Sequence, residues 1–283
     1  MSAATSECCA YYEDDKCVES YLDHVARAIR VWYEIRQYYE SAVRRALGGW
    51  KVNCDPIVPA LILHDIGKLV RDYWYKRALR HEIIGAYVTR KVLDGIGVRT
   101  RARDILSLAV LLHHESIIIA HYVAAHGEKY FTVASLRKAL EDADLTPICD
   151  VNSLVEEIAK QLESCSCDPN ITSNVKKELP NLLRNLNLNK NDIFNVLKDL
   201  IVNATVGEPS KLRELRARVA AVTHAIVVSD SVAAYYGRSV CSNVSSGTGY
   251  NGGTWIVQRA LEGAELLDDN NLRNNLCSSL RKC

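Results

Sequence analysis

Seven imidazole and carboxylate side chains lie on the apolar faces of expected helices, and this placement constrains the fold more than any other feature of the sequence. Each alone is more often a hydrogen-bonded core residue than a metal ligand. As a group they favour a metal site, because an ionised carboxylate without a partner in a core costs several kcal/mol, and a divalent cation is a partner that all of them can share. These residues are His24, His64, Asp65, His81, His113, His114 and Asp230.

The overall composition indicates a globular protein with a large core. The chain has 283 residues, of which 48% are apolar and 24% are charged, as is typical of soluble domains. Its N-terminus has no basic segment followed by an apolar one, and its continuous apolar runs are shorter than the ~18 residues of a membrane span. We therefore expect a cytoplasmic protein that does not bind a membrane.

The ten cysteines leave the redox state open. They include the adjacent Cys8 and Cys9 and the close pair Cys165 and Cys167, but no two CxxC units, so a structural zinc site is not expected. Without a secretion signal, reduced thiols are the default, although intracellular proteins of hyperthermophiles do carry disulfides. Both states are compatible with the sequence.

Helical periodicity dominates the chain, and no internal repeat or clear strand pattern accompanies it. The expected fold class is therefore all-α. Pro56 and Pro59 begin a short apolar helix that contains His64 and Asp65, as proline is tolerated in a first helical turn. We expect the other main helices over residues 19–47, over residues 76–93, from about residue 101 towards His113, and over residues 209–237.

Two stretches depart from this helical core. Residues 127–210 are richer in Asn, Lys and Glu and carry shorter helix signals, so we interpret them as a helical insertion. Residues 238–283 are a Gly-, Ser- and Asn-rich loop followed by a last helix from about Trp255. We therefore expect one domain over residues 1–237, which includes the insertion, and a separate tail over residues 238–283.

The net charge of +1 hides a basic block between Lys68 and Arg103, where ten Lys and Arg residues stand against three acids. Such a block is a candidate anion-binding surface. Its first part, KLVRDYWYKRALRH, interleaves aromatic and basic residues, as in grooves that bind single-stranded nucleic acid. A solvated basic helix whose rings pack on the core explains the pattern equally well.

The order of the seven polar residues resembles the two-metal branch of the HD metallohydrolase superfamily. The segments HDIGK, RHEIIGAY, AVLLHHE and VVSDSVAA are most similar to the HD nuclease of type I CRISPR interference, in its form as a stand-alone subunit. The similarity covers about residues 20–235. It implies an HD-domain helical bundle around a dinuclear metal site.

By position, the resemblance implies two ligand sets that share Asp65. It also makes Asp65 and Lys68 catalytic candidates, because Lys68 matches the family lysine that faces the phosphate; a lysine that extends from the core to solvent is the alternative. Imidazole with carboxylate favours Mn, Ni, Co, Fe or Zn and disfavours Mg. One ion would be bound by His24, His64, Asp65 and Asp230, and the other by Asp65, His81, His113 and His114.

The resemblance further implies a nuclease that cuts single-stranded DNA, or RNA, during CRISPR interference. No GxxxxGK[ST] motif is present in the sequence, so a separate helicase would be needed, and an RNA-guided surveillance complex would select the target. Ser231 stands where the family often has an arginine, so substrate contacts are less well predicted than metal binding.

Two other functions are compatible with these residues. The first is a nucleotide or cyclic-dinucleotide phosphohydrolase with metals in the same places. The cyclic-dinucleotide enzymes continue from HHE into a DGxGYP segment, whereas this chain continues with SIIIAHYVAAHG. The second is a non-catalytic helical adaptor, against which the intact set of seven polar residues argues.

Overall fold

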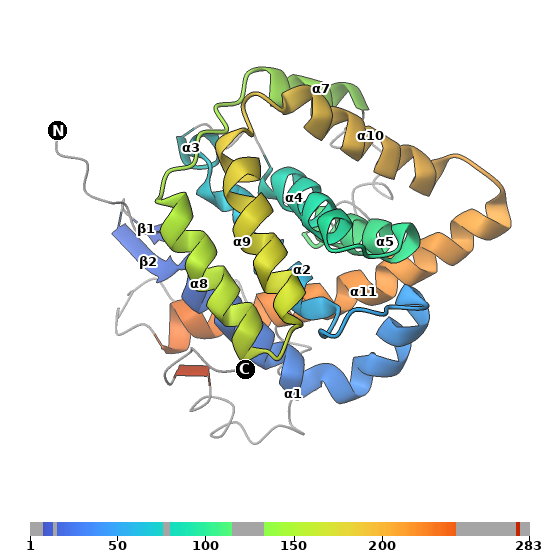
Figure 1. Cartoon of the computed structure of the whole chain (residues 1–283), viewed down its shortest axis with the longest axis horizontal. Coiled ribbons are helices and arrows are strands. Elements are labelled where there is room, and N and C mark those ends of the chain that lie inside the picture. Colours follow the sequence, from blue (N-terminus) through green and yellow to red (C-terminus); the bar gives the residue numbers. More distant parts are fainter. Residues whose placement is uncertain (1–7, 14–15, 76–79, 115–132, 242–275, 278–283) are drawn as a thin grey trace.

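The computed structural model describes residues 8–13, 16–75, 80–114, 133–241 and 276–277. This part of the chain is a helical bundle with one two-stranded hairpin (Figure 1), which confirms the all-α class. Its elements are β1 (Cys9–Glu13), β2 (Lys16–Ser20), α1 (Tyr21–Leu47), α2 (Ile57–Leu63), the 3-10 helix η1 (Ile66–Leu69), α3 (Arg71–Tyr75), α4 (His81–Gly95), α5 (Thr100–Leu111), α7 (Val133–Glu141), α8 (Val151–Ser164), α9 (Pro169–Arg184), α10 (Lys190–Thr205), α11 (Pro209–Tyr235) and the π-helical turn η2 (Tyr236–Val240).

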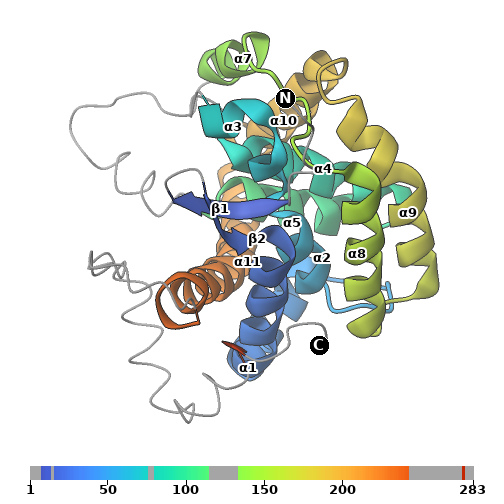
Figure 2. The same cartoon turned by 90° about the vertical axis from the view of Figure 1, so that its left-hand side faces the viewer.

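The two longest helices, α1 and α11, lie side by side (Figure 1, Figure 2) and form the base of the bundle. The side chain of Ser20 accepts a hydrogen bond from Asp23 N and so caps α1, and Pro209 occupies the first turn of α11. By length and composition α11 could cross a membrane, but 61% of its apolar window is buried. Its packing against α1, α2 and α5 accounts for that apolar character as a core helix.

The helices of residues 133–205 surround α4 and α5 from one side (Figure 1). The segment is helical as expected, and its buried side chains, such as Ile158 and Leu179, belong to the same hydrophobic cluster as those of α1, α2, α4 and α5. It therefore enlarges the central core and does not have a core of its own. The expected domain limits at residues 1–237 and 238–283 stay predictions.

Three helix ends differ from the expected ones, and all three lie at candidate site residues. Helix α2 ends at Leu63, before His64 and Asp65. Helix α4 begins only at His81, because Arg80 is extended with ψ 127°, and α5 ends before His113. Apolar periodicity continues through these positions in the sequence, so it does not mark the turns. As a result, the polar side chains project from helix termini.

The β1–β2 hairpin, which the sequence analysis missed, is held by disulfides. All nine cysteines in the described part of the chain are disulfide-bonded, so in the structure the open redox question is answered in favour of oxidation. Cys9–Cys17 closes the hairpin, Cys8–Cys149 ties it to the segment before α8, and two further bridges are Cys54–Cys167 and Cys241–Cys277. Cys8–Cys149 and Cys54–Cys167 connect segments that lie 141 and 113 residues apart in the sequence.

Replacing both cysteines of the Cys8–Cys149 bridge by serine should destabilise the protein more than the same change at Cys9–Cys17. The bridges span 141 and 8 residues, and loop entropy predicts a loss of about 5 kcal/mol for the first and about half that for the second. Urea unfolding of the two double variants without reductant measures the difference. Equal losses would contradict the loop-entropy explanation.

Candidate metal centre

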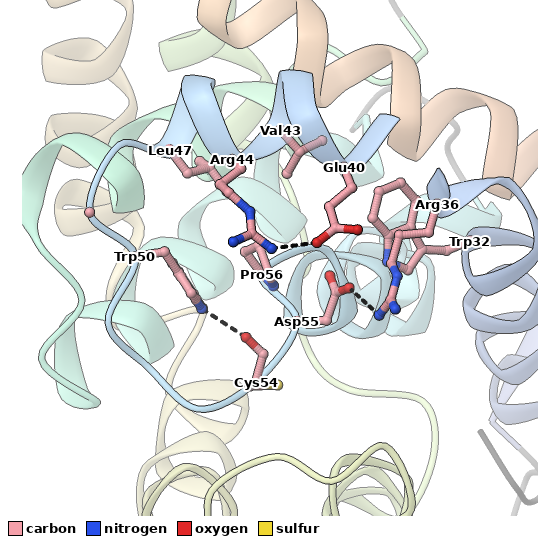
Figure 3. Close-up of a pocket in the computed structure, with 11 residues that line it drawn as sticks. Trp32, Arg36, Glu40, Val43, Arg44, Leu47, Trp50, Cys54, Asp55 and Pro56 are labelled. Carbon is pink, nitrogen blue, oxygen red and sulfur yellow. Dashed lines mark hydrogen bonds and ion pairs between the residues drawn. The ribbon is translucent and has the colours of Figure 1, made fainter. Parts of the chain in front are cut away.

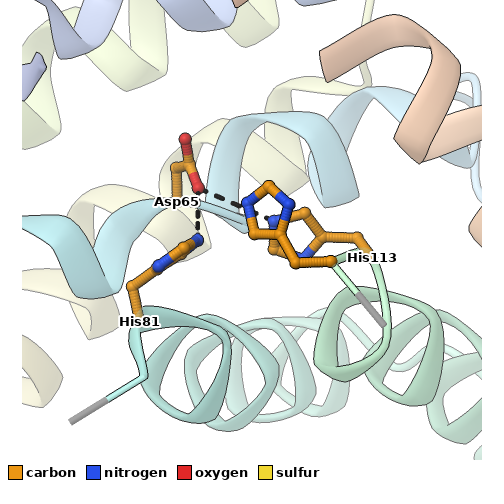
Figure 4. Close-up of side chains that lie close together, drawn as sticks. Asp65, His81 and His113 are labelled. Carbon is orange, nitrogen blue, oxygen red and sulfur yellow. Dashed lines mark ion pairs between the residues drawn. The ribbon is translucent and has the colours of Figure 1, made fainter. Parts of the chain in front are cut away.

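Asp65 lies at the centre of the site, and its two oxygens face different histidines. Oδ1 is 3.0 Å from His81 Nε2 and 3.7 Å from His113 Nε2 (Figure 4). Oδ2 is 3.3 Å from His24 Nε2 and 3.5 Å from His64 Nε2. The carboxylate is fully buried. It is therefore placed to bridge two groups of imidazoles.

Asp230, from the middle of the apolar stripe of α11, completes the first group. Its Oδ1 is 3.0 Å from His24 Nε2 and 3.5 Å from His64 Nε2, and its Oδ2 is 3.8 Å from His114 Nε2. The structure thus brings all seven candidate residues together. They form two groups whose ligand atoms lie within 4.8 Å of one another, His24, His64, Asp65 and Asp230 in one and Asp65, His81, His113 and His114 in the other.

These donor sets fit divalent cations. The described core contains five buried site atoms without a hydrogen-bond partner, an arrangement that native structures rarely leave uncompensated. All five face the interior of the two groups, where one cation in each would satisfy them. A mixed imidazole and carboxylate set suits Mn, Fe, Co, Ni or Zn. The atoms are Nε2 of His24, His64, His81 and His113, and Oδ1 of Asp65.

Backbone carbonyls fix the tautomer of two of the histidines. His64 Nδ1 lies 2.6 Å from Leu61 O and His113 Nδ1 lies 2.6 Å from Val110 O. Because a carbonyl only accepts, each Nδ1 donates its proton, and the lone pair of each Nε2 points to the centre. The turns that end α2 and α5 create both contacts.

The electrostatics of the centre keep its carboxylates ionised. Burial alone would raise the pKa of Asp65, but His64, Lys68 and His81 outweigh it and hold that pKa well below its ordinary value. Burial opposes protonation of His24, yet Glu19, Asp230 and Asp65 raise its pKa well above the ordinary value. The acids are thus ionised and attract cations.

Lys68 is part of this centre. It is 5% exposed, and its Nζ donates to Asp65 Oδ2. Burial lowers its pKa, but Asp65 and Asp230 outweigh burial and raise it, so the side chain carries a positive charge beside the shared carboxylate. A lysine that extends to solvent would be exposed, so the structure does not favour that alternative.

Two glycines set the distance between the HDIGK segment and α4. A Cβ at Gly67 would lie 2.2 Å from His81 O, and a Cβ at Gly85 would lie 2.2 Å from His64 O. Both clashes involve backbone atoms, which cannot move aside as a flexible side chain can. The absence of these two side chains therefore allows His81 to reach Asp65.

Gly85→Ala should lower stability by at least about 1–3 kcal/mol, since the added methyl forces two backbones apart. It should also weaken binding of Mn²⁺. Gly95→Ala, in the same helix, is the control, because its Cβ would meet only Glu178 Cγ at 4.0 Å. Thermal unfolding and Mn²⁺ titration of both variants test this, and similar behaviour of the two would refute the close-packing explanation.

A hollow with a volume of about 380 Å³ lies between α1 and the loop before α2 (Figure 3). No histidine is among its described lining residues. Its charges pair with one another, since Arg44 contacts Glu40 and Arg36 lies 3.5 Å from Asp55. It does not offer the donor set of the histidine site.

Most of the described cations in the basic block between Lys68 and Arg103 are held in ion pairs. Besides Lys68, six of its cations contact carboxylates, several of which come from distant segments, such as Asp144, Asp192 and Glu214. Residues 76–79 lie outside the described part, so the aromatic and basic interleaving is only partly visible. The paired cations are Arg71, Arg80, Arg90, Lys91, Arg101 and Arg103.

The sequence analysis missed two buried acids behind the candidate ligands, Glu19 and Glu82. Glu19 is 3% exposed and Glu82 is 2% exposed, and each lies next to a candidate ligand histidine. The adjacency of Glu82 to His81 in the sequence was a usable signal, whereas Glu19 had none because the hairpin was not expected. His121 and His126 lie outside the described residues.

Comparisons with known proteins show the family of the chain. The HD domain family model matches residues 21–167. A protein of Thermoproteus tenax named CRISPR-associated endonuclease Cas3-HD is 31% identical over 227 residues, which cover 79% of this chain and 88% of the relative. A protein of the same name from Methanocaldococcus jannaschii is 33% identical over 116 residues, which cover 36% of this chain and 47% of the relative.

A solved structure, the CRISPR-associated Cas3 HD domain protein of Methanocaldococcus jannaschii, matches with a TM-score of 0.48 and 21% identity over 74% of this chain and 95% of the other. On the family match and the 31% identity, the chain belongs to the HD domain family of metal-dependent hydrolases. Within that family it is a CRISPR-associated nuclease of the Cas3-HD type. The resemblance stated from the sequence is thereby confirmed.

Proposed function

We propose that the chain cuts single-stranded DNA during CRISPR interference, with a separate helicase that supplies the strand and an RNA-guided surveillance complex that selects it. The observation that carries this proposal is the sharing of Asp65 between two ligand groups, one at each oxygen. Two divalent ions bound there would supply a water nucleophile at neutral pH and positive charge for the phosphate oxygens.

The residues of this chain have separate parts in that chemistry. Asp65 and Asp230 hold negative charge between the imidazoles, which keep their Nε2 atoms directed inward. Lys68 offers a fixed cation beside Asp65, where it would stabilise a phosphate that gains negative charge during the reaction. No serine or cysteine nucleophile is required.

The exposed fractions of the site side chains favour a flexible substrate. The other ligand side chains are at most 8% exposed, whereas the His114 side chain is 37% exposed. Among the described ligands, a substrate therefore has His114 as its main point of approach. A single strand can bend towards one exposed side chain of a buried site more easily than a duplex. The endonuclease names of the relatives support a nucleic-acid substrate.

A cytoplasmic location is part of the proposal, because the expected partners act on nucleic acid inside the cell. Disulfides do occur in intracellular proteins of hyperthermophiles, so the bonded cysteines are compatible with that location.

Incubation of the protein with circular single-stranded DNA plus Mn²⁺, Co²⁺ or Ni²⁺ should linearise the circle, and a chelator should stop the reaction. Asp65→Asn should reduce the rate more than about 100-fold, because loss of an outer-shell partner alone costs about 10- to 100-fold. A parallel reaction with circular RNA determines the preference for sugar type.

Two results would reject this function. Hydrolysis of nucleotides or cyclic dinucleotides with intact circles would identify a small-molecule phosphohydrolase. Absence of any metal-dependent turnover, together with weaker partner binding by the Asp65→Asn variant, would identify an adaptor.

Lys68→Ala should lower the cleavage rate about 100- to 1,000-fold and leave the number of bound ions unchanged, since the residue stabilises charge and is not a ligand. Lys68→Arg should restore part of the rate. Lys91→Ala is the control, because Lys91 pairs with Asp192 at 2.8 Å on the outer side of α4. A wild-type rate for Lys68→Ala would show that the lysine has no catalytic part.

A further inference from the structure

The four buried histidines of the centre direct Nε2 inward, but their Nδ1 atoms face two kinds of neighbour. His64 and His113 donate to backbone carbonyls. His24 and His81 instead face glutamates: His24 Nδ1 is 3.3 Å from Glu19 Oε1, and His81 Nδ1 is 3.5 Å from Glu82 Oε2. Each ligand group therefore contains one histidine with a carbonyl behind it and one with a carboxylate behind it.

Several contacts hold Glu19 in place. Arg27 Nη1 donates to its Oε1, and Arg238 Nε lies 3.4 Å from its Oε2. The residue belongs to β2, in the hairpin that Cys9–Cys17 closes. A Cβ at Gly237 would lie 2.1 Å from Glu19 Oε1, so the backbone of η2 packs directly against the carboxylate and limits its movement.

Glu82 has a similar arrangement. Arg80 Nη2 donates to its Oε1 at 2.6 Å, which leaves Oε2 towards His81. Its position in the first turn of α4 adds the positive end of the helix dipole. In both cases an arginine neutralises a buried carboxylate that remains an acceptor for an imidazole N–H.

Neither pair is aligned as a full hydrogen bond here, since His24 Nδ1 and Glu82 Oε2 are buried without a hydrogen-bond partner. A buried donor and a buried acceptor at 3.3–3.5 Å need only a small rotation of the ring to bond. An ion at Nε2 would favour that rotation, because a carboxylate behind a ligand histidine fixes its tautomer and raises its basicity.

We infer that Glu19 and Glu82 are matched positioning residues, Glu19 for the ion bound by His24, His64, Asp65 and Asp230, and Glu82 for the ion bound by Asp65, His81, His113 and His114. The inference rests on the dinuclear centre of the proposed function and is independent of its nucleic-acid substrate. On this inference, each ion has its own glutamate behind one of its ligand histidines.

Glu19→Gln and Glu82→Gln should therefore each weaken one ion and spare the other. We expect one tightly bound Mn²⁺ per chain in each variant and a 10- to 100-fold weaker second site. Mn²⁺ titration, metal analysis after gel filtration, and the spin coupling of paired Mn²⁺ in electron paramagnetic resonance measure this without any substrate.

Second substitutions identify which ion remains. In the Glu19→Gln background, His81→Ala should release the remaining ion, whereas His64→Ala should not. In the Glu82→Gln background, the two results should be exchanged. Gly237→Ala should reproduce the Glu19→Gln pattern, because its methyl group would displace the carboxylate of Glu19.

Glu13→Gln, at an exposed position of the same hairpin, is the matched control and should bind both ions as the wild type does. The inference is overturned if both variants bind two ions with wild-type affinity, or if each loses both ions equally while remaining folded by circular dichroism. Failure of the wild-type chain itself to bind two ions would instead overturn the dinuclear centre.

Discussion

The buried carboxylate of Asp65 is the interaction on which the rest of the centre depends. Its oxygens face two pairs of imidazoles, so the fold must bring α1, the turn after α2, the start of α4 and the end of α5 to one small group. Helix termini make this possible, because a side chain at a terminus can turn away from the helix face. Glycines at the contact between η1 and α4 bring the two backbones close enough. The apolar core thus serves to hold a polar group that would be unfavourable by itself.

The positive and negative charges around the centre are balanced before any ion is considered. Asp65 pairs with Lys68, Glu19 with Arg27 and Arg238, and Glu82 with Arg80, and Asp230 adds a fourth carboxylate to these four cations. Two divalent cations would therefore add a surplus of positive charge to a region where the protein is close to neutral. Such a surplus would suit an anionic substrate, although six other cations of the described basic block are held in ion pairs elsewhere.

The sequence predicted the all-α class, and it identified the seven residues that the structure brings together. The apolar setting of those residues could be read from the sequence, because a charged residue in an apolar helical stripe is conspicuous. The family resemblance, carried by the order H, HD, H, HH, D, added the division into two ligand groups. The helix ends at His64, His81 and His113 were not readable, because apolar periodicity continues across them. The partners of the basic block come from segments up to about a hundred residues away, and only tertiary structure joins them. Glu19 was missed because it lies in a five-residue strand whose hairpin depends on a disulfide and not on a strong strand pattern.

The Cys54–Cys167 bridge encloses the residues of one ligand group but not all residues of the other. The covalent ring that it closes contains the complete donor set of one group, Asp65, His81, His113 and His114, whereas the other group also needs His24 and Asp230 from outside the ring. If unfolding begins where α1 packs against α11, the group that contains His24 and Asp230 is therefore lost first. The group of Asp65, His81, His113 and His114 stays within the ring that the disulfide closes. The two halves, though chemically alike, differ in how far the molecule can come apart before each is lost.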